Sequence, residues 1–124
     1  MDSRPTGRRE RLIHARRARV RQAVPRAAFL GATDYAHRGL HGPGTGFVEN
    51  SLPAFSAAAE RGFGIECDVR LSADGIVFVF HDDRLDRMTD ARGRLADRTA
   101  DALDRIVLGS DGPIPRLSAL LGLV

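Results

Sequence analysis

The chain has 124 residues, of which 43% are hydrophobic, and this is enough for one modest domain. No stretch reaches the ~18 apolar residues that a membrane span needs, which excludes a transmembrane segment. The formal net charge is +3, but residues 1–26 alone carry +7, so the remainder is acidic. An acidic body suits a cation site better than a nucleic-acid surface.

Residues 1–28 form an arginine-rich extension that we expect to be disordered or loosely helical, with residues 29–124 as the domain. Such a tail is able to contact RNA, DNA or anionic lipid, but no specific nucleic-acid partner is expected. Pro25 and Arg26 interrupt the apolar run that a secretory signal would need. Cys67 is the only cysteine, so no intrachain disulfide forms, and we expect a cytoplasmic protein.

A short strand is expected to end at residues 37–39, which read His-Arg-Gly. Glycine at position 39 permits a turn that other residues resist, so His37 and Arg38 would project from the strand end. The arginine guanidinium offers a planar set of donors that matches phosphate oxygens. His41, in the glycine-rich loop that follows, is interpreted as a bystander.

A helix is expected to begin at Asn50 or Ser51, either of which can cap it, with Pro53 in the first turn. Apolar residues recur at helical spacing up to Phe63, and Gly62 can end the helix. A strand, a helix and a second strand in succession make a βαβ unit, which indicates an α/β fold.

Residues 65–71 alternate between apolar and polar side chains, which predicts a half-buried strand with Glu66 and Asp68 on its polar face. The turn pair Asp74-Gly75 and the apolar run 76–80 predict an antiparallel hairpin. A two-residue loop would set Asp68 opposite His81, and a four-residue loop would set Glu66 there. Either register brings one imidazole beside two carboxylates, whereas an odd loop would not.

After the hairpin, we expect an irregular segment followed by two helices. Residues 82–97 are polar and indicate an irregular insertion. A short helix is predicted over residues 100–107, capped by Thr99, and an apolar helix over residues 117–124.

Taken together and in order, these motifs resemble the glycerophosphodiester phosphodiesterase family. The resemblance covers roughly residues 35–124 and rests on the following pieces: His37-Arg38-Gly39, Glu49-Asn50-Ser51, Glu66-Cys67-Asp68-Val69, Asp74-Gly75, His81-Asp82, Leu85-Asp86-Arg87-x-Thr89 and Ile114-Pro115-x-Leu117.

The resemblance implies the N-terminal portion of a (β/α)8 TIM-type barrel, with a small insertion after the second strand and an apparent truncation. A complete barrel needs about 250 residues, and its active site lies at the carboxyl ends of the strands. A complementing C-terminal half or an oligomer is therefore an expected partner.

The same resemblance implies hydrolysis of a glycerophosphodiester to glycerol 3-phosphate and an alcohol. His37 and His81 would act as general acid and base, Arg38 would hold the phosphate, and Glu66 and Asp68 would bind Mg²⁺ or Ca²⁺. Asn50 is expected to orient a substrate hydroxyl or the metal shell, or only to cap its helix. The alternative is a catalytically incomplete fragment that lacks a third metal ligand.

Overall fold

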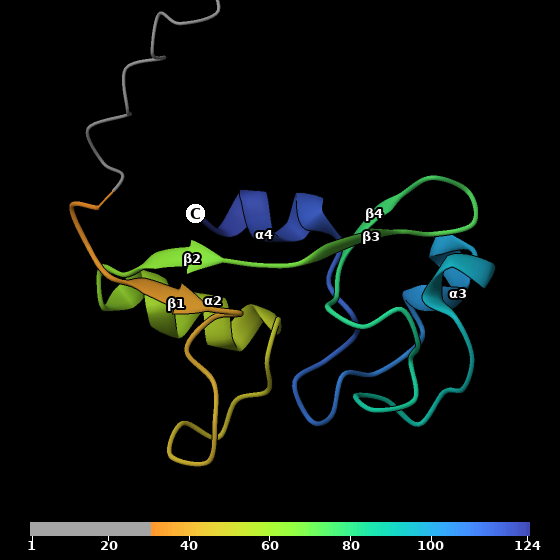
Figure 1. Ribbon diagram of the computed structural model, residues 1–124, viewed down its shortest axis with the longest axis horizontal. Helices are drawn as coiled ribbons and strands as arrows, with labels where there is room; N and C mark the ends of the chain where they lie inside the picture. The colour runs from red at the N-terminus through yellow and green to blue at the C-terminus, as the bar shows by residue number, and fades with distance from the viewer. Residues whose placement is uncertain (1–30) are drawn as a thin grey trace, which may run out of the picture. The chain divides into compact units, whose positions relative to one another are not determined.

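The computed structural model describes residues 31–124, so the expectations for the basic extension at 1–28 lie outside the described residues. Residues Thr33–Val124 make up one unit (Figure 1). Its elements, in chain order, are β1 (Tyr35–His37), α2 (Leu52–Glu60), β2 (Gly64–Glu66), β3 (Val69–Leu71), β4 (Val77–Val79), the 3-10 helix η1 (Leu95–Asp97), α3 (Ala100–Leu103) and α4 (Leu117–Leu123).

The βαβ unit expected from the sequence is present. Strands β1 and β2 pair in parallel, with His37 opposite Glu66 at the end of the ladder, and α2 connects them. Ser51 caps α2, because its hydroxyl oxygen accepts a hydrogen bond from Ala54 N at 3.2 Å. The helix ends before Gly62, whose φ of +73° turns the chain toward β2.

Gly39 lets the turn after β1 approach α2 closely. Its φ is +81°, and a Cβ atom at this position would lie 2.9 Å from the Ala54 Cβ and 3.0 Å from the Ala54 carbonyl carbon. The backbone of the next residue is bonded to the same place, since Leu40 N donates to Ala54 O at 2.9 Å. The turn therefore needs glycine for both its conformation and its space.

The hairpin forms, but both predicted registers are wrong. Val69 pairs with Val79 and Leu71 with Val77, so that the loop is Ala73–Gly75, three residues long. Gly75 has φ +82°, which suits the left-handed residue that ends such a loop. An odd loop removes His81 from the position opposite either carboxylate.

The single strand predicted over residues 65–71 is also wrong, because the extended chain changes partners part-way. Residues 64–66 pair with β1 in one sheet, residues 69–71 pair with β4 in another, and Cys67 and Asp68 lie between the two ladders. The alternation of side chains is the same in either case, so the sequence pattern alone does not reveal the break.

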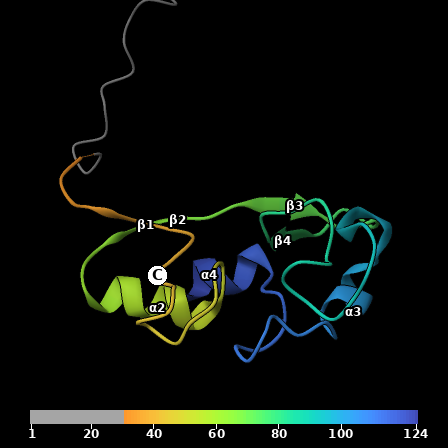
Figure 2. The same cartoon turned by 60° about the horizontal axis from the view of Figure 1, so that its bottom comes forward.

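Strand β4 is apolar throughout because it faces a different core on each side. Its Val79 packs with Phe55 of α2 and Leu120 of α4, whereas Phe78 and the following Phe80 belong to a second cluster with η1 and α3. Helices α2 and α4 lie side by side beneath the strands, as Figure 2 shows. Strand β4 also bonds to the segment before α4, since Val79 N donates to Pro115 O at 2.8 Å and Phe78 forms a bridge with Arg116.

The later helices are close to expectation, with one difference. Thr99 caps α3, but this helix ends at Leu103 rather than at 107, because Ile106 O and Leu108 N bond to Ile114 and Gly112 as the chain folds back. None of the helices among the described residues is both long and apolar enough to cross a membrane.

We predict that Gly39→Ala lowers the free energy of unfolding by about 2–4 kcal/mol, since it adds a left-handed residue with a side chain and a clash with α2. Chemical denaturation followed by circular dichroism measures this. Gly44→Ala is the matched control in the same loop, because a Cβ there meets nothing within 4 Å. Equal stabilities of the two variants would contradict the argument.

Candidate active site at the ends of the first two strands

The site begins where β1 and β2 end together. His37 Nε2 lies 3.8 Å from Glu66 Oε2, and its side chain is 68% exposed. The backbone N–H of Arg38 points to the same residue, 2.9 Å from Glu66 O and 3.2 Å from Glu66 Oε2. Parallel pairing alone therefore gathers a histidine, an arginine and a carboxylate at one strand edge.

Two non-glycine residues with left-handed backbones hold this edge. Arg38 has φ +59° and Asn50 has φ +56°, and they are joined directly, because Asn50 N donates to Arg38 O at 2.8 Å. Such conformations carry a free-energy cost and persist where surrounding contacts impose them. Asn50 is thus not the cap of α2, a role that Ser51 takes.

Asp68 joins the same group through its side chain. Its Oδ2 accepts a hydrogen bond from Asn50 Nδ2 at 3.2 Å and lies 3.3 Å from Arg38 Nε. The second contact is an attraction of opposite charges without hydrogen-bond geometry. Asn50 is only 1% exposed, and its Oδ1 is a buried acceptor with no hydrogen-bond partner among the described residues.

Glu49 links this group to the segment that follows β4. Its Oε2 accepts from Arg38 Nη1 at 2.9 Å, and its Oε1 accepts from Arg87 Nη1 at 2.7 Å. The residue is 9% exposed, so the two guanidinium groups replace most of its solvent. Arg87 above all, and Arg38 after it, hold the pKa of the Glu49 carboxyl below its usual range.

Arg87 also connects Glu49 to Asp82 and, through Asp82, to His81. Its Nε and Nη2 donate to the two Asp82 carboxylate oxygens at 2.7 and 3.0 Å, and Asp82 Oδ1 lies 2.7 Å from His81 Nδ1. The arginine holds the pKa of the Asp82 carboxyl far below its usual range, so that Asp82 is ionised and only accepts hydrogen bonds. His81 Nδ1 is therefore the donor, which leaves Nε2 toward solvent or a ligand.

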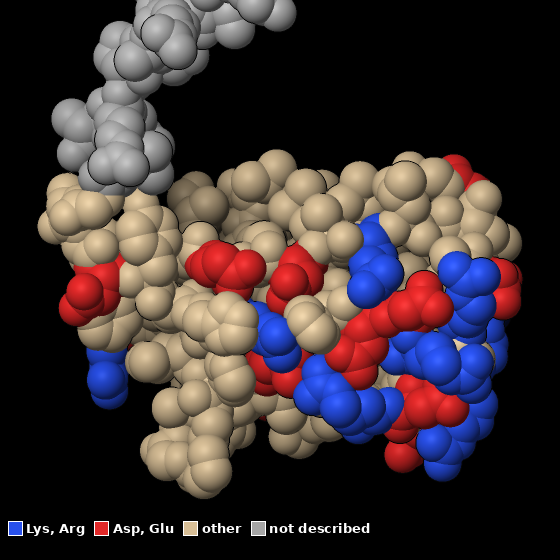
Figure 3. All heavy atoms as spheres, viewed as in Figure 1, with Lys and Arg blue, Asp and Glu red and all other residues tan. Residues whose placement is uncertain are grey.

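All six residues predicted from the sequence thus lie in one connected set of contacts, although not by the route expected. His81 does not face Glu66 or Asp68 across the hairpin; it is linked to them through Asp82, Arg87, Glu49 and Arg38 in turn. Figure 3 shows that acidic and basic side chains are interleaved on the face of the molecule that is seen in Figure 1.

The three linking residues were missed as members of the site. Glu49, Asp82 and Arg87 each stand inside a motif used for the family resemblance. Glu49 is next to Asn50 and Asp82 is next to His81, whereas no neighbour of Arg87 has a predicted role. The contact between Glu49 and Arg87 joins positions 38 residues apart, and no periodicity in the sequence signals a contact of that kind.

The oxygen atoms near the strand ends are of the chemical type that a hard divalent cation prefers as ligands. Glu66 and Asp68 supply carboxylates, and the unpartnered Asn50 Oδ1 is an amide oxygen, the other type of ligand that such ions accept. Burial raises the pKa of the intervening Cys67 thiol, which keeps it neutral and unsuited to ligation. Among residues 31–124, no three acidic, histidine or cysteine side chains converge into a metal-binding group. Glu66 and Asp68 are therefore two candidate carboxylate ligands without a third among the described residues.

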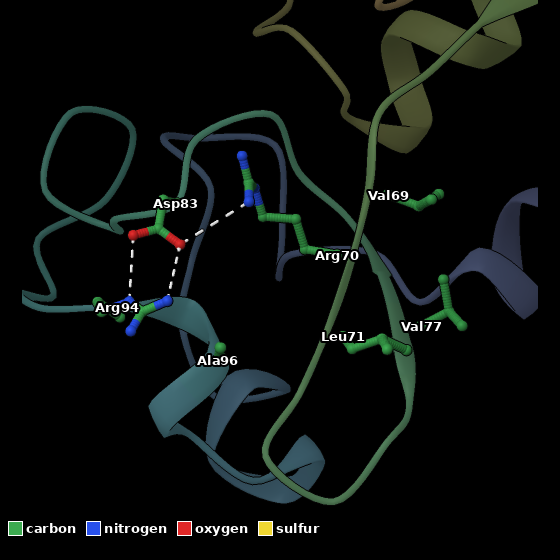
Figure 4. A pocket seen from close by; sticks show the side chains of 7 residues that line it. All are labelled: Val69, Arg70, Leu71, Val77, Asp83, Arg94 and Ala96. Carbon is green, nitrogen blue, oxygen red and sulfur yellow. Dashed lines mark hydrogen bonds and ion pairs between the residues drawn. The ribbon is translucent and has the colours of Figure 1, made fainter.

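An open cavity of about 380 Å³ adjoins the hairpin but contains none of the six residues. Figure 4 shows its charged side, where Asp83 lies between Arg70 and Arg94, at 3.8 Å and 3.1 Å respectively. Arg70 Nε also donates to His81 O at 2.9 Å, so one lining residue of this cavity is bonded to the backbone of His81. The remaining lining is apolar: Val69, Leu71, Val77 and Ala96.

Over residues 37–119 the chain matches the Glycerophosphoryl diester phosphodiesterase family. The chain belongs to this family. The matched segment contains all six candidate residues and the three that link them. The resemblance inferred from the sequence motifs is therefore confirmed.

Named relatives and solved structures agree with this assignment. A glycerophosphodiester phosphodiesterase of Bacillus altitudinis is 42% identical over 57% of this chain. The crystal structure of a glycerophosphodiester phosphodiesterase from Agrobacterium tumefaciens superposes on 72% of the chain, with a TM-score of 0.65 and 33% identity. An Oleispira antarctica phosphodiesterase in complex with the product sn-glycerol-3-phosphate covers 73%, with a TM-score of 0.65 and 34% identity.

The chain spans only part of these proteins. It covers 28% of the Bacillus altitudinis relative, 41% of the Agrobacterium tumefaciens chain and 39% of the Oleispira antarctica chain. The neighbours are TIM-barrel proteins, so the mixed α/β arrangement described here corresponds to a portion of such a barrel.

We predict that Glu49→Gln lowers the free energy of unfolding by about 1–3 kcal/mol near pH 7, because two guanidinium groups lose their shared anion. The folded-state pKa of Glu49 lies below its ordinary value of 4.5. Its stabilising contribution is therefore fully present above that value and is lost as the pH falls through the folded-state pKa. Urea unfolding of both proteins should show the difference shrinking below about pH 4.

The matched control is Glu60→Gln, which removes an exposed carboxylate from the end of α2. It should leave the unfolding free energy within about 0.5 kcal/mol of that of the original chain. A Glu49 variant that behaves like this control would show that the buried ion pairs add nothing to stability.

Proposed function

We propose that this chain carries the N-terminal portion of a (β/α)8 barrel whose hairpin and following loops form an insertion after the second strand. We further propose that its site hydrolyses glycerophosphodiesters to glycerol 3-phosphate and an alcohol, with a divalent cation bound. The observation that carries the proposal is the continuous set of contacts from His37 to His81, inside a segment that matches the family.

Arg38 is the proposed phosphate-binding residue. A phosphodiester repels nucleophiles by its negative charge, and a fixed guanidinium offsets that charge as it develops on the non-bridging oxygens. Arg38 is held by its backbone and by Glu49 through Nη1, which leaves Nη2 without a hydrogen-bond partner among the described residues. The Oleispira antarctica phosphodiesterase binds its product sn-glycerol-3-phosphate, which supports a phosphate-bearing ligand for this site.

Glu66 and Asp68 are the proposed ligands of Mg²⁺ or Ca²⁺, with Asn50 Oδ1 beside them for the metal shell or a substrate hydroxyl. Each carboxylate uses one oxygen in the contacts described above and retains the other. When bound, the cation would supply positive charge beside the phosphate. The family resemblance implies a third acidic ligand, for which a complementing segment or a second copy of the chain is the proposed source.

His37 and His81 are the proposed acid and base. One imidazole takes the proton from the attacking hydroxyl, and the other protonates the leaving alkoxide, each for about 10²–10⁴ in rate. For His81 the reacting atom is Nε2, because Nδ1 is bonded to Asp82. Both rings are partly exposed to solvent, so a substrate can reach them.

We predict that the purified chain releases glycerol 3-phosphate from glycerophosphocholine with added Mg²⁺ or Ca²⁺, and that chelator stops the release. His37→Gln and His81→Gln should each lower the rate by about 10²–10⁴, since each removes one proton-transfer group. An enzyme-coupled assay for glycerol 3-phosphate measures all of these rates.

His41→Gln is the control, because His41 lies in the loop after the strand end and has no part in the contacts above. It should retain the original rate. Equal rates in the His37, His81 and His41 variants would refute the acid–base assignment. No release from any glycerophosphodiester would favour the alternative, a family segment that is catalytically incomplete as it stands.

A further inference from the structure

We propose that Arg87 is a positioning residue that holds two groups of the site at once, His81 through Asp82 and Arg38 through Glu49. The inference rests on the proposed function, because it concerns how that same site is kept in order. It assigns a role to a residue that touches neither the expected phosphate position nor the metal ligands.

The geometry of Arg87 carries the first half of the argument. Its guanidinium uses Nε and Nη2 on the two oxygens of Asp82 and Nη1 on Glu49, at 2.7, 3.0 and 2.7 Å. Paired N–H donors on both oxygens of one carboxylate fix the plane of that carboxylate as well as its place. Arg87 is thus bonded to two carboxylates with defined directions, which a lysine ammonium could not reproduce.

The consequence for His81 follows from the Asp82 carboxylate. Asp82 Oδ1 lies 2.7 Å from His81 Nδ1, and an ionised carboxylate only accepts hydrogen bonds. The neutral ring is therefore held with its proton on Nδ1 and its free electron pair on Nε2. With Arg87 removed, Asp82 loses both bonds that orient it, and the ring is free to rotate and to change tautomer.

The consequence for Arg38 follows from Glu49. Arg38 and Arg87 occupy different oxygens of this carboxylate, so each guanidinium restricts the rotation that would release the other. The Arg38 contact survives the loss of Arg87, but with one restraint fewer. We therefore expect a larger effect on the step that needs His81 than on phosphate binding.

The first test is kinetic and uses the full chain with glycerophosphocholine and divalent cation. Arg87→Gln should lower kcat by about 10- to 100-fold, the usual effect of removing a partner that orients a reacting group, and raise KM by a smaller factor. In a His81→Gln background the same substitution should change kcat less than about twofold, because the ring that it positions is gone. A purely structural role would lower kcat equally in both backgrounds, which would overturn the proposal.

Arg84→Gln is the matched control. Arg84 lies in the same segment and also pairs with a carboxylate, Asp86 at 3.2 Å, but it is 58% exposed and belongs to none of the contacts above. It should retain kcat and KM within about twofold. A comparable loss in the Arg84 variant would show that any ion pair in this segment has the same effect, and would overturn the specific role of Arg87.

The second test does not depend on activity. Long-range ¹H–¹⁵N spectra of the histidine rings report which nitrogen carries the proton, with His81→Gln used to assign the signal. The original chain and the Arg84 variant should show neutral His81 with the proton on Nδ1, and Arg87→Gln should show a mixture of the two tautomers. An unchanged tautomer in Arg87→Gln would overturn the proposal, whereas a chain that fails to hydrolyse but shows this change would refute only the proposed function.

Discussion

A single buried carboxylate, that of Glu49, connects the two parts of the candidate site. It accepts hydrogen bonds from Arg38, at the end of β1, and from Arg87, in the segment after β4. Burying such a group costs several kcal/mol unless charged partners replace its water, and here two guanidinium groups do so. The same pairing that stabilises Glu49 therefore fixes the distance between the two arginines.

The positions of those arginines depend in turn on how the backbone is packed. Arg38 stands in a left-handed conformation between a parallel ladder and a glycine that fits closely against α2, and its carbonyl is bonded to Asn50. The segment that carries Arg87 leaves β4, a strand whose two faces are buried in different clusters. The backbone that carries the site is thus packed on two small cores to which β4 contributes on both faces.

Charge alternates from Arg38 to Asp82: Glu49 lies between two arginines, and Arg87 lies between two carboxylates. The arginine contacts hold the pKa values of the Glu49 and Asp82 carboxyls below their usual range, so both groups are ionised. The contacts also give each ionisable group a direction: the donors of Arg87 orient Asp82, and Asp82 orients the ring of His81. The family assignment explains why these residue types occur together, and the contacts explain how each is held.

Local patterns were sufficient to predict much of this protein. The strand ending in His37-Arg38-Gly39, the helix that begins at Asn50 or Ser51, the turn at Gly75 and the family itself follow from periodicity, capping and motif order, which depend on neighbours along the chain. Tertiary structure decided the rest. The three-residue loop, the break between β2 and β3, and the bonds from Glu49 to both arginines depend on pairing between distant segments, and alternating side chains look the same in either register.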